Sequence, residues 1–180
     1  FNINENEILY LNFKDYTKNI NINFQGKNSK AVIYNSNLKN SKINLKFNTK
    51  SDYVKKSYDE NLLTGCLTII DSNINNISIN SKGGNCEDTI NFIRSKGSIK
   101  ELNVIDSPSD SVDMDFSNIV INNAYIRNAK NDCIDFSYGF YEIDDAVLSF
   151  CNDKAISIGE TSELNAKNLI ISNSNIAIAI

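Results

Sequence analysis

The stretch Asp110-Ser-Val-Asp-Met-Asp115 is followed 22 residues later by Asp132-Cys-Ile-Asp-Phe-Ser137. Apolar and polar side chains alternate in both, as they do in a β-strand with one buried face. The same step of 22 connects two apolar columns, which are Ile90, Val112, Ile134, Ile156 and Ile178, and Phe92, Met114, Phe136, Ile158 and Ile180. Between them runs a mostly polar column of Asn91, Asp113, Asp135, Ser157 and Ala179.

A second strand follows in each repeat, because further apolar columns recur at 22 or 23 residues. They are Ile99, Ile121, Ile143 and Ala166; Leu102, Ala124, Ala146 and Leu169; and Val104, Ile126, Leu148 and Ile171. One repeat earlier, Leu67 and Ile69 precede Ile90 and Phe92, and Ile74, Ile77 and Ile79 supply the second strand. Stacked identical turns produce such columns, so the sequence predicts an all-β, right-handed parallel β-helix (a β-solenoid) with coils of about 22 residues.

The regular repeat covers residues 62–180. Residues 1–61 are expected to form irregular earlier coils, with strands near 20–24, 32–34 and 43–47, and a polar loop at 48–61. Both parts are expected to form one continuous domain. Because the chain starts at Phe1 and ends on the strand-like 175–180, we expect a fragment of a longer protein.

The overall charge and hydropathy restrict the partners. A formal net charge of −4 argues against nucleic acid and anionic membrane surfaces. The sequence holds no run of 18 apolar residues, so no membrane span is expected in this segment.

The four cysteines form two pairs that each span about one coil, namely Cys66 with Cys86 and Cys133 with Cys151. The ends of one coil lie close together, so each pair could form a disulfide. Disulfides favour a secreted, periplasmic or cell-surface protein, and the alternative is four reduced cysteines in the cytosol.

Acidic residues flank the first strand in two columns. One holds Asp88, Asp110, Asp132 and Lys154, and the other holds Asp113 and Asp135, with Asp115 beside them. These acids could be solvated or could cap corners. Asp113, Asp115 and Asp135 could bind Ca²⁺, the one cofactor we consider. The acids could also act as general acids and bases on a glycan, and Asp110, Asp113, Asp132 and Lys154 are then the catalytic candidates.

Three segments on successive coils, 108–113, 131–134 and 151–159, resemble the polygalacturonase family of β-helix glycoside hydrolases. That family carries N-T-D, G-D-D-C and C-x-G-H-G-[IL]-S-I-G in this order. The resemblance implies that Asp110 and Asp132 match family acids and that Cys133 bonds Cys151. However, Asn131 stands where the family has its general acid, and Lys154 where it has histidine. An amide cannot protonate a leaving group, so hydrolysis by that pair is not expected.

A broader resemblance covers residues 62–180. The segments 87–95, 110–117, 131–137 and 153–160 look like uncharacterised bacterial β-helix repeat proteins, some of which follow a CotH-like region in surface proteins. This resemblance implies a fold and an extracellular or envelope setting rather than an activity.

Two further groups have two interpretations each. Lys154 could form a salt bridge with Asp132 or act as the base of a lyase or epimerase. Tyr138 could stack on a sugar within an aromatic cluster with Phe140 and Tyr141, although alternation places Tyr141 in the core column of Ile119. Asp135, Arg127 and Tyr138 are therefore the substrate-binding candidates, with Arg127 on a different face.

The preferred interpretation is a structural or carbohydrate-associated module of a secreted or surface bacterial protein, without catalysis, with a polysaccharide or cell-surface glycan as the partner. The alternative is a polysaccharide-acting glycoside hydrolase, lyase or epimerase. The module predicts a paired acid ladder without a cleft, whereas the enzyme predicts side chains that converge in a groove on one sheet. A third interpretation is a Ca²⁺-stabilised adhesin.

Overall fold

The computed structural model describes residues 1–48 and 62–180. Throughout these two ranges the ordered elements are β-strands, with no helix among them. The expected polar loop at 48–61 therefore lies, apart from Asn48, outside the described residues. The described part of the chain also contains no helix of the length and hydropathy needed to cross a bilayer.

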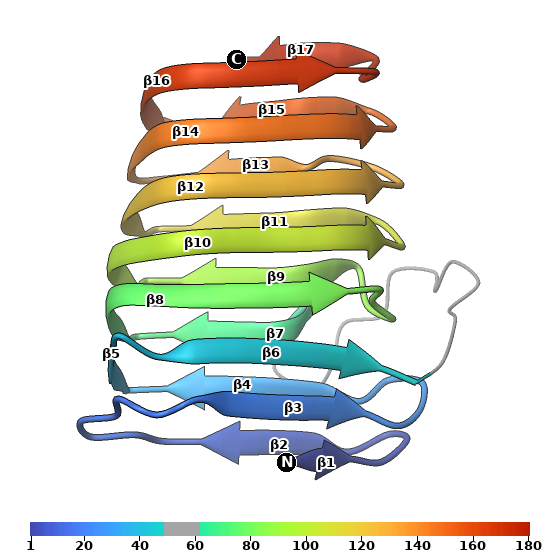
Figure 1. The fold of residues 1–180 in the computed structure, drawn as a ribbon, viewed down its shortest axis with the longest axis vertical. Helices are drawn as coiled ribbons and strands as arrows, with labels where there is room; N and C mark the ends of the chain where they lie inside the picture. The colour runs from blue at the N-terminus through green and yellow to red at the C-terminus, as the bar shows by residue number, and fades with distance from the viewer. Residues whose placement is uncertain (49–61) are drawn as a thin grey trace.

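The strands form two parallel sheets, named here sheet A and sheet B (Figure 1). Sheet A holds β1 (Asn2–Ile3), β3 (Ile20–Phe24), β6 (Lys42–Phe47), β8 (Asn73–Lys82), β10 (Lys96–Ser107), β12 (Asn118–Ala129), β14 (Phe140–Cys151) and β16 (Glu163–Ser172), and β5 (Asn37–Lys39) also pairs with β8. Sheet B holds β2 (Ile8–Leu11), β4 (Lys30–Tyr34), β7 (Gly65–Ile70), β9 (Asp88–Ile93), β11 (Asp110–Asp115), β13 (Ile134–Ser137), β15 (Lys154–Gly159) and β17 (Ile176–Ala179).

The chain alternates between the sheets and so forms a right-handed solenoid. In Figure 1 it climbs from the N-terminus at the bottom, while the nearer strands of sheet A run to the right and the farther strands of sheet B run to the left. Right-handed crossover is the general rule for parallel strands, and it follows from the twist of the strands. The predicted fold class is confirmed.

The register confirms the apolar columns. On sheet B, Ile90 pairs with Val112, Val112 with Ile134, Ile134 with Ile156 and Ile156 with Ile178. The first four are fully buried, whereas Ile178 is 41% exposed because β17 is the last strand in the order of sheet B. On sheet A the three predicted columns also pair as expected from β10 through β16.

One corner of the solenoid repeats the same backbone turn in successive coils. From β4 to β15, the residue after each sheet B strand has a positive φ between 36° and 51°, at Asn35, Asp71, Arg94, Phe116, Tyr138 and Glu160. Non-glycine residues rarely adopt this left-handed conformation, and here each coil holds the next one in it. This corner therefore accepts bulky side chains that point outward.

A ladder of hydroxyl groups supports this corner. The backbone N–H of Ser36 donates to Ser72 Oγ at 3.0 Å, and the same contact joins Ser72 to Ser95 and Ser95 to Ser117. In the next coil Gly139 replaces the serine, because a Cβ there would lie 2.1 Å from the Ser117 carbonyl oxygen. The Tyr141 hydroxyl accepts the Ser117 N–H instead, at 3.3 Å.

The N-terminal coils keep the same two sheets with a less even spacing. Ile20 pairs with Ile43 after 23 residues, but Ala31 pairs with Leu67 after 36, in the coil that contains residues 49–61. The three strands expected in this part correspond to β3, β4 and β6.

Candidate functional site

The first acidic column connects three successive coils of sheet B through the carboxylates of Asp110 and Asp132. Asp110 Oδ1 accepts hydrogen bonds from the backbone N–H of Asp132 and from the side-chain amide of Asn131, both at 2.7 Å. Asp132 Oδ1 in turn accepts the backbone N–H of Lys154 at 2.8 Å. These two carboxylates thus cap the coil that follows each of them, so this part of the column is built into the corner rather than freely solvated.

Lys154 ends this column with two ion pairs. Its ammonium nitrogen lies 3.0 Å from an oxygen of Asp132 and 3.0 Å from an oxygen of Asp153. The Asp132 side chain is only 3% exposed, so this contact is largely removed from water. Hydrogen bonds to the two carboxylates raise the pKa of Lys154, which keeps it protonated at neutral pH. A base needs the neutral amine, so the geometry favours the salt-bridge reading.

The second acidic column lies on the outer face of sheet B. Asp113 pairs in register with Asn91 and Asp135, and Asp135 pairs with Ser157. The amide nitrogen of Asn91 donates to Asp113 Oδ2 at 2.9 Å and to Asp115 Oδ2 at 3.1 Å. Asn91 is 1% exposed, and its Oδ1 accepts no hydrogen bond from the residues that the structure describes. Its side-chain amide therefore sits among carboxylates with an unused acceptor.

Burial changes the acidity of both columns. Loss of hydration is the main cause that raises the pKa of Asp110 to about 6, and it also raises the pKa values of Asp88 and Asp113. Neighbouring carboxylates add to the effect, for example Asp88 on Asp113. Loss of hydration is also the largest cause that raises the pKa values of Asp115 and Asp135. The cluster consequently retains protons near neutral pH.

The two columns line one groove of about 620 Å³. Its lining comes from five successive coils and includes Thr64, Glu87, Asp88, Ser109, Asp110, Asp113, Lys130, Asn131, Asp132, Asp135 and Lys154. All four catalytic candidates are therefore brought together, along with Asp135. The sequence offered two alternatives, a paired acid ladder without a cleft or side chains that converge in a groove. The structure has features of both, because the acids are partly paired and also line a groove.

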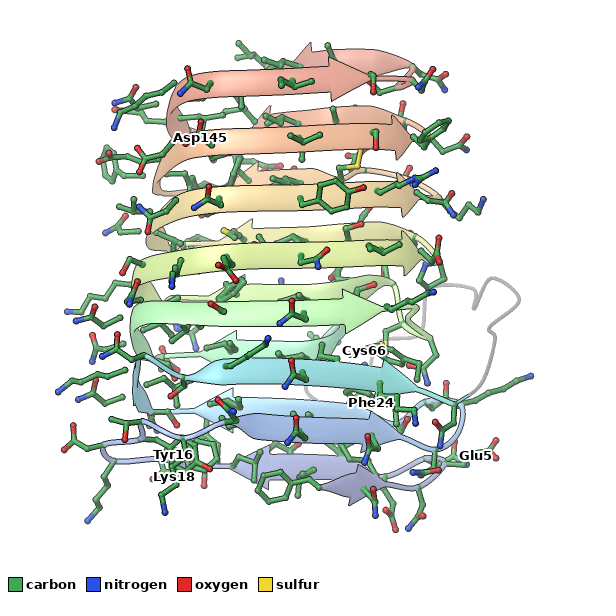
Figure 2. All side chains as sticks on the ribbon, in the orientation of Figure 1. Glu5, Tyr16, Lys18, Phe24, Cys66 and Asp145 are labelled. Atoms are coloured by element: carbon green, nitrogen blue, oxygen red, sulfur yellow. A yellow bond between two sulfur atoms is a disulfide. The ribbon has the colours of Figure 1, made fainter. Side chains whose placement is uncertain are left out.

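Both predicted disulfides are present, between Cys66 and Cys86 and between Cys133 and Cys151. Their sulfur atoms lie at the corner that leads from sheet A into sheet B; Cys66 is labelled there in Figure 2. In sequence they adjoin the groove residues, since Cys86 precedes Glu87 and Cys133 follows Asp132. The disulfides therefore hold the groove at two levels of the solenoid.

Two predicted substrate-binding residues lie elsewhere. Arg127 is on β12 of sheet A, where its guanidinium carbon lies 5.4 Å from the centroid of the Phe150 ring. Tyr138 lies at the left-handed corner and stacks on Phe116, with ring centroids 4.6 Å apart. Tyr141 is buried in the core column of Ile119, as alternation predicted.

The proposed calcium ligands do not converge. Within residues 1–48 and 62–180, no three acidic, cysteine or histidine side chains are arranged to hold a metal ion. Asp113 and Asp115 instead share the amide of Asn91. Calcium binding by Asp113, Asp115 and Asp135 stays a prediction without geometric support.

Sequence reasoning did not assign Thr64, Glu87, Ser109, Lys130 or Asn131 to the site. Thr64 directly precedes Gly65, which pairs with the groove residue Asp88. The sequence does not reveal that pairing, because the register of the preceding coil is irregular. Lys130 and Asn131 directly precede Asp132, so extending the column by two residues along the chain would have included them.

Comparisons with known proteins do not identify a family for this chain. A scan of protein-family models found no match, and neither did searches of curated proteins and of solved structures. Neither resemblance described above gains support from these comparisons.

Proposed function

We propose that this chain is a glycan-binding module whose ligand lies in the acidic groove of sheet B. The groove itself is the observation that carries the proposal. It is long, polar and lined by carboxylates, amides and hydroxyls, the groups that protein sites use to bind the hydroxyls of sugars.

The repetition of the groove favours a polymer over a small molecule. Each of five successive coils contributes at least one polar residue to the lining of the groove, and stacked strands are about 4.8 Å apart. A pyranose unit in an extended polysaccharide advances by a similar distance, so successive sugar units could meet successive coils. A repeating site is then matched to a repeating ligand.

The two disulfides support a secreted or cell-surface setting, because disulfides persist in oxidising compartments. Binding without catalysis is favoured by the engagement of the polar groups. Asn131 stands where polygalacturonases have their general acid, and its side-chain amide donates a hydrogen bond to Asp110. The Lys154 ammonium group is held by two carboxylates.

The test is calorimetric titration of the chain with a panel of neutral, amino and acidic oligosaccharides. We expect at least one class to bind, and Asp110→Asn with Asp135→Asn to weaken that binding. Asp145→Asn is the matched control, because it removes the same charge from β14 of sheet A, whereas the groove lies on sheet B. If no class binds, or if Asp145→Asn weakens binding as much as the groove variants, the proposal fails.

A second candidate, a polysaccharide-acting enzyme, is favoured by one observation. The groove holds protonated and ionised carboxyls together, since burial raises the pKa of Asp113 while Asp110 is ionised above about pH 6. Such a pair could serve as general acid and base. The test is the appearance of new reducing ends or unsaturated products after incubation with polysaccharides. Products that persist unchanged with Asp113→Asn would rule out this assignment.

A further inference from the structure

The two disulfides close loops of nearly the same length in different surroundings. Cys66–Cys86 and Cys133–Cys151 have sequence separations of 20 and 18 residues. The chain entropy lost on closing the loop is therefore almost equal for the two bonds. All four cysteines are buried, and Cys86, at 5%, is the most exposed of them. Any difference in how readily the two disulfides are reduced is then set mainly by the groups around their sulfur atoms.

Asn85 makes the surroundings of the first disulfide different. Its side-chain Oδ1 lies 2.9 Å from the sulfur of Cys66 and 3.2 Å from the sulfur of Cys86. The orientation of this amide is fixed, because its nitrogen donates to the Gly26 carbonyl oxygen, which can only accept. Asn85 is 1% exposed. Within residues 1–48 and 62–180, no hydrogen-bonding group contacts the sulfur atoms of the second disulfide in this way.

These contacts suit two thiols better than a disulfide. A disulfide sulfur has no proton to donate, so in the oxidised chain the Asn85 Oδ1 is a buried acceptor with no donor among the described residues, which is costly. A thiol is both a weak donor and a weak acceptor. After reduction, the S–H groups of Cys66 and Cys86 can donate to this oxygen. The backbone N–H of Asn85 already donates to the Cys66 sulfur, at 3.4 Å, and can continue to do so.

We propose that Cys66–Cys86 is a reversible redox switch, whereas Cys133–Cys151 is a permanent cross-link. The reductant is a dithiol. One of its thiolates attacks the sulfur of Cys86, the less buried of the two, and forms a mixed disulfide, while Cys66 leaves as a thiolate that the Asn85 N–H stabilises. The second thiol of the reductant then displaces Cys86. The reductant leaves as a disulfide, and each cysteine has gained one electron and one proton from it.

The switch lies at one level of the acidic groove. The bond connects β7 to the segment that leads into β9, and this segment includes the groove residues Glu87 and Asp88. The side chain of Asn85 also ties the segment to the coil of β4, through Gly26 and Ser29. Because these hydrogen bonds do not depend on the disulfide, reduction should loosen this level of the groove without unfolding the solenoid.

The test equilibrates the full chain at pH 7 in buffers that differ in the ratio of reduced to oxidised dithiothreitol. Free thiols are alkylated, and the two cysteine pairs are quantified separately by mass spectrometry. We expect Cys66–Cys86 to be half reduced at a ratio about tenfold or more below that for Cys133–Cys151. Where only the first pair is reduced, far-UV circular dichroism should keep the signal of the β-sheets. Amide hydrogen exchange should rise in residues 84–93 and stay unchanged in 131–137.

Variants test the part played by the amide. Asn85→Ala removes the acceptor, so it should raise the half-reduction ratio of Cys66–Cys86 about tenfold, toward that of the other disulfide. Asn152→Ala is the matched control, because Asn152 is an exposed asparagine next to Cys151, and it should change neither ratio. If Asn85→Ala does not fold, the comparison of the two disulfides in the unchanged chain still tests the proposal.

Four results would overturn the switch. They are reduction of both disulfides at the same ratio, reduction of Cys133–Cys151 first, loss of the β-sheet signal together with the first reduction, and a folded Asn85→Ala chain whose half-reduction ratio does not differ from that of Asn152→Ala.

Discussion

The ammonium nitrogen of Lys154 lies 3.0 Å from Asp132 Oδ2, one coil away, and the Asp132 side chain is 3% exposed. A nearly buried carboxylate with a partner on the next coil ties two turns of the solenoid together. The cost of breaking this contact depends on what remains around Asp132, which still accepts the backbone N–H of Lys154.

Lys154→Met is expected to reduce the free energy of unfolding by about 1–3 kcal/mol, because it leaves a buried carboxylate without its charged partner. Urea denaturation at neutral pH measures the change. Lys167→Met is the matched control, since Lys167 pairs with Asp144 at 2.6 Å but is 61% exposed. Exposed ion pairs contribute little, so the control should change stability much less. Equal losses in both variants would contradict the buried character of the Asp132 contact.

The free energy of unfolding should fall as the pH rises from 4 to 8. Asp110 has its pKa raised from 3.8 to about 6 in the folded state, so the folded chain keeps a proton that the unfolded chain has lost. Its contribution is present below about pH 4 and is lost as the pH rises through 6, by about 3 kcal/mol. The raised pKa values of Asp88 and Asp113 act in the same direction. Urea midpoints between pH 4 and 8 test this slope.

Asp113→Asn should flatten that slope and stabilise the chain at pH 8, because the amide has no charge to bury and can still accept a hydrogen bond from Asn91. Asp145→Asn, which removes an exposed charge from sheet A, should leave the slope unchanged. A wild-type midpoint that rises with pH would show that the cluster is hydrated in solution.

Tyr141→Phe is expected to cost about 1–3 kcal/mol, because it leaves the buried N–H of Ser117 without its acceptor. The hydroxyl also donates to the Met114 carbonyl at 2.9 Å, which would lose its donor. Tyr125→Phe, on an exposed tyrosine of sheet A, is the control and should be nearly neutral. Thermal unfolding that does not distinguish the two variants would argue against the hydroxyl ladder.

Each disulfide should contribute roughly 3 kcal/mol, the value expected for closing loops of about 20 residues. The double variants Cys66→Ala/Cys86→Ala and Cys133→Ala/Cys151→Ala test the two bonds separately by urea denaturation. Mass spectrometry of unreduced peptides should detect 66–86 and 133–151 pairs. Crossed pairs, or four free thiols after secretion into an oxidising compartment, would contradict the structure.

Most of the fold could be predicted from the sequence. The column of Ile90, Val112, Ile134 and Ile156 determined the coil length, and it pairs in register as expected. The same spacing indicated which cysteines could pair, and strand alternation predicted the core position of Tyr141; the structure has both disulfides and buries Tyr141. These properties follow from periodicity along the chain, because a solenoid places residues one period apart next to each other.

Only the tertiary structure decided how deeply the polar columns are buried. Alternation puts Asn91 on the outer face of sheet B, yet Asn91 is 1% exposed. A Cβ at Gly65, on the neighbouring strand β7, would lie only 2.9 Å from the Cβ of Asn91. The regular period of the coils is enough to predict which residues are neighbours. The hydration of Asp110 and Asp113, and with it their pKa values, depends instead on how closely other groups surround each carboxyl in three dimensions, which the period along the chain does not determine.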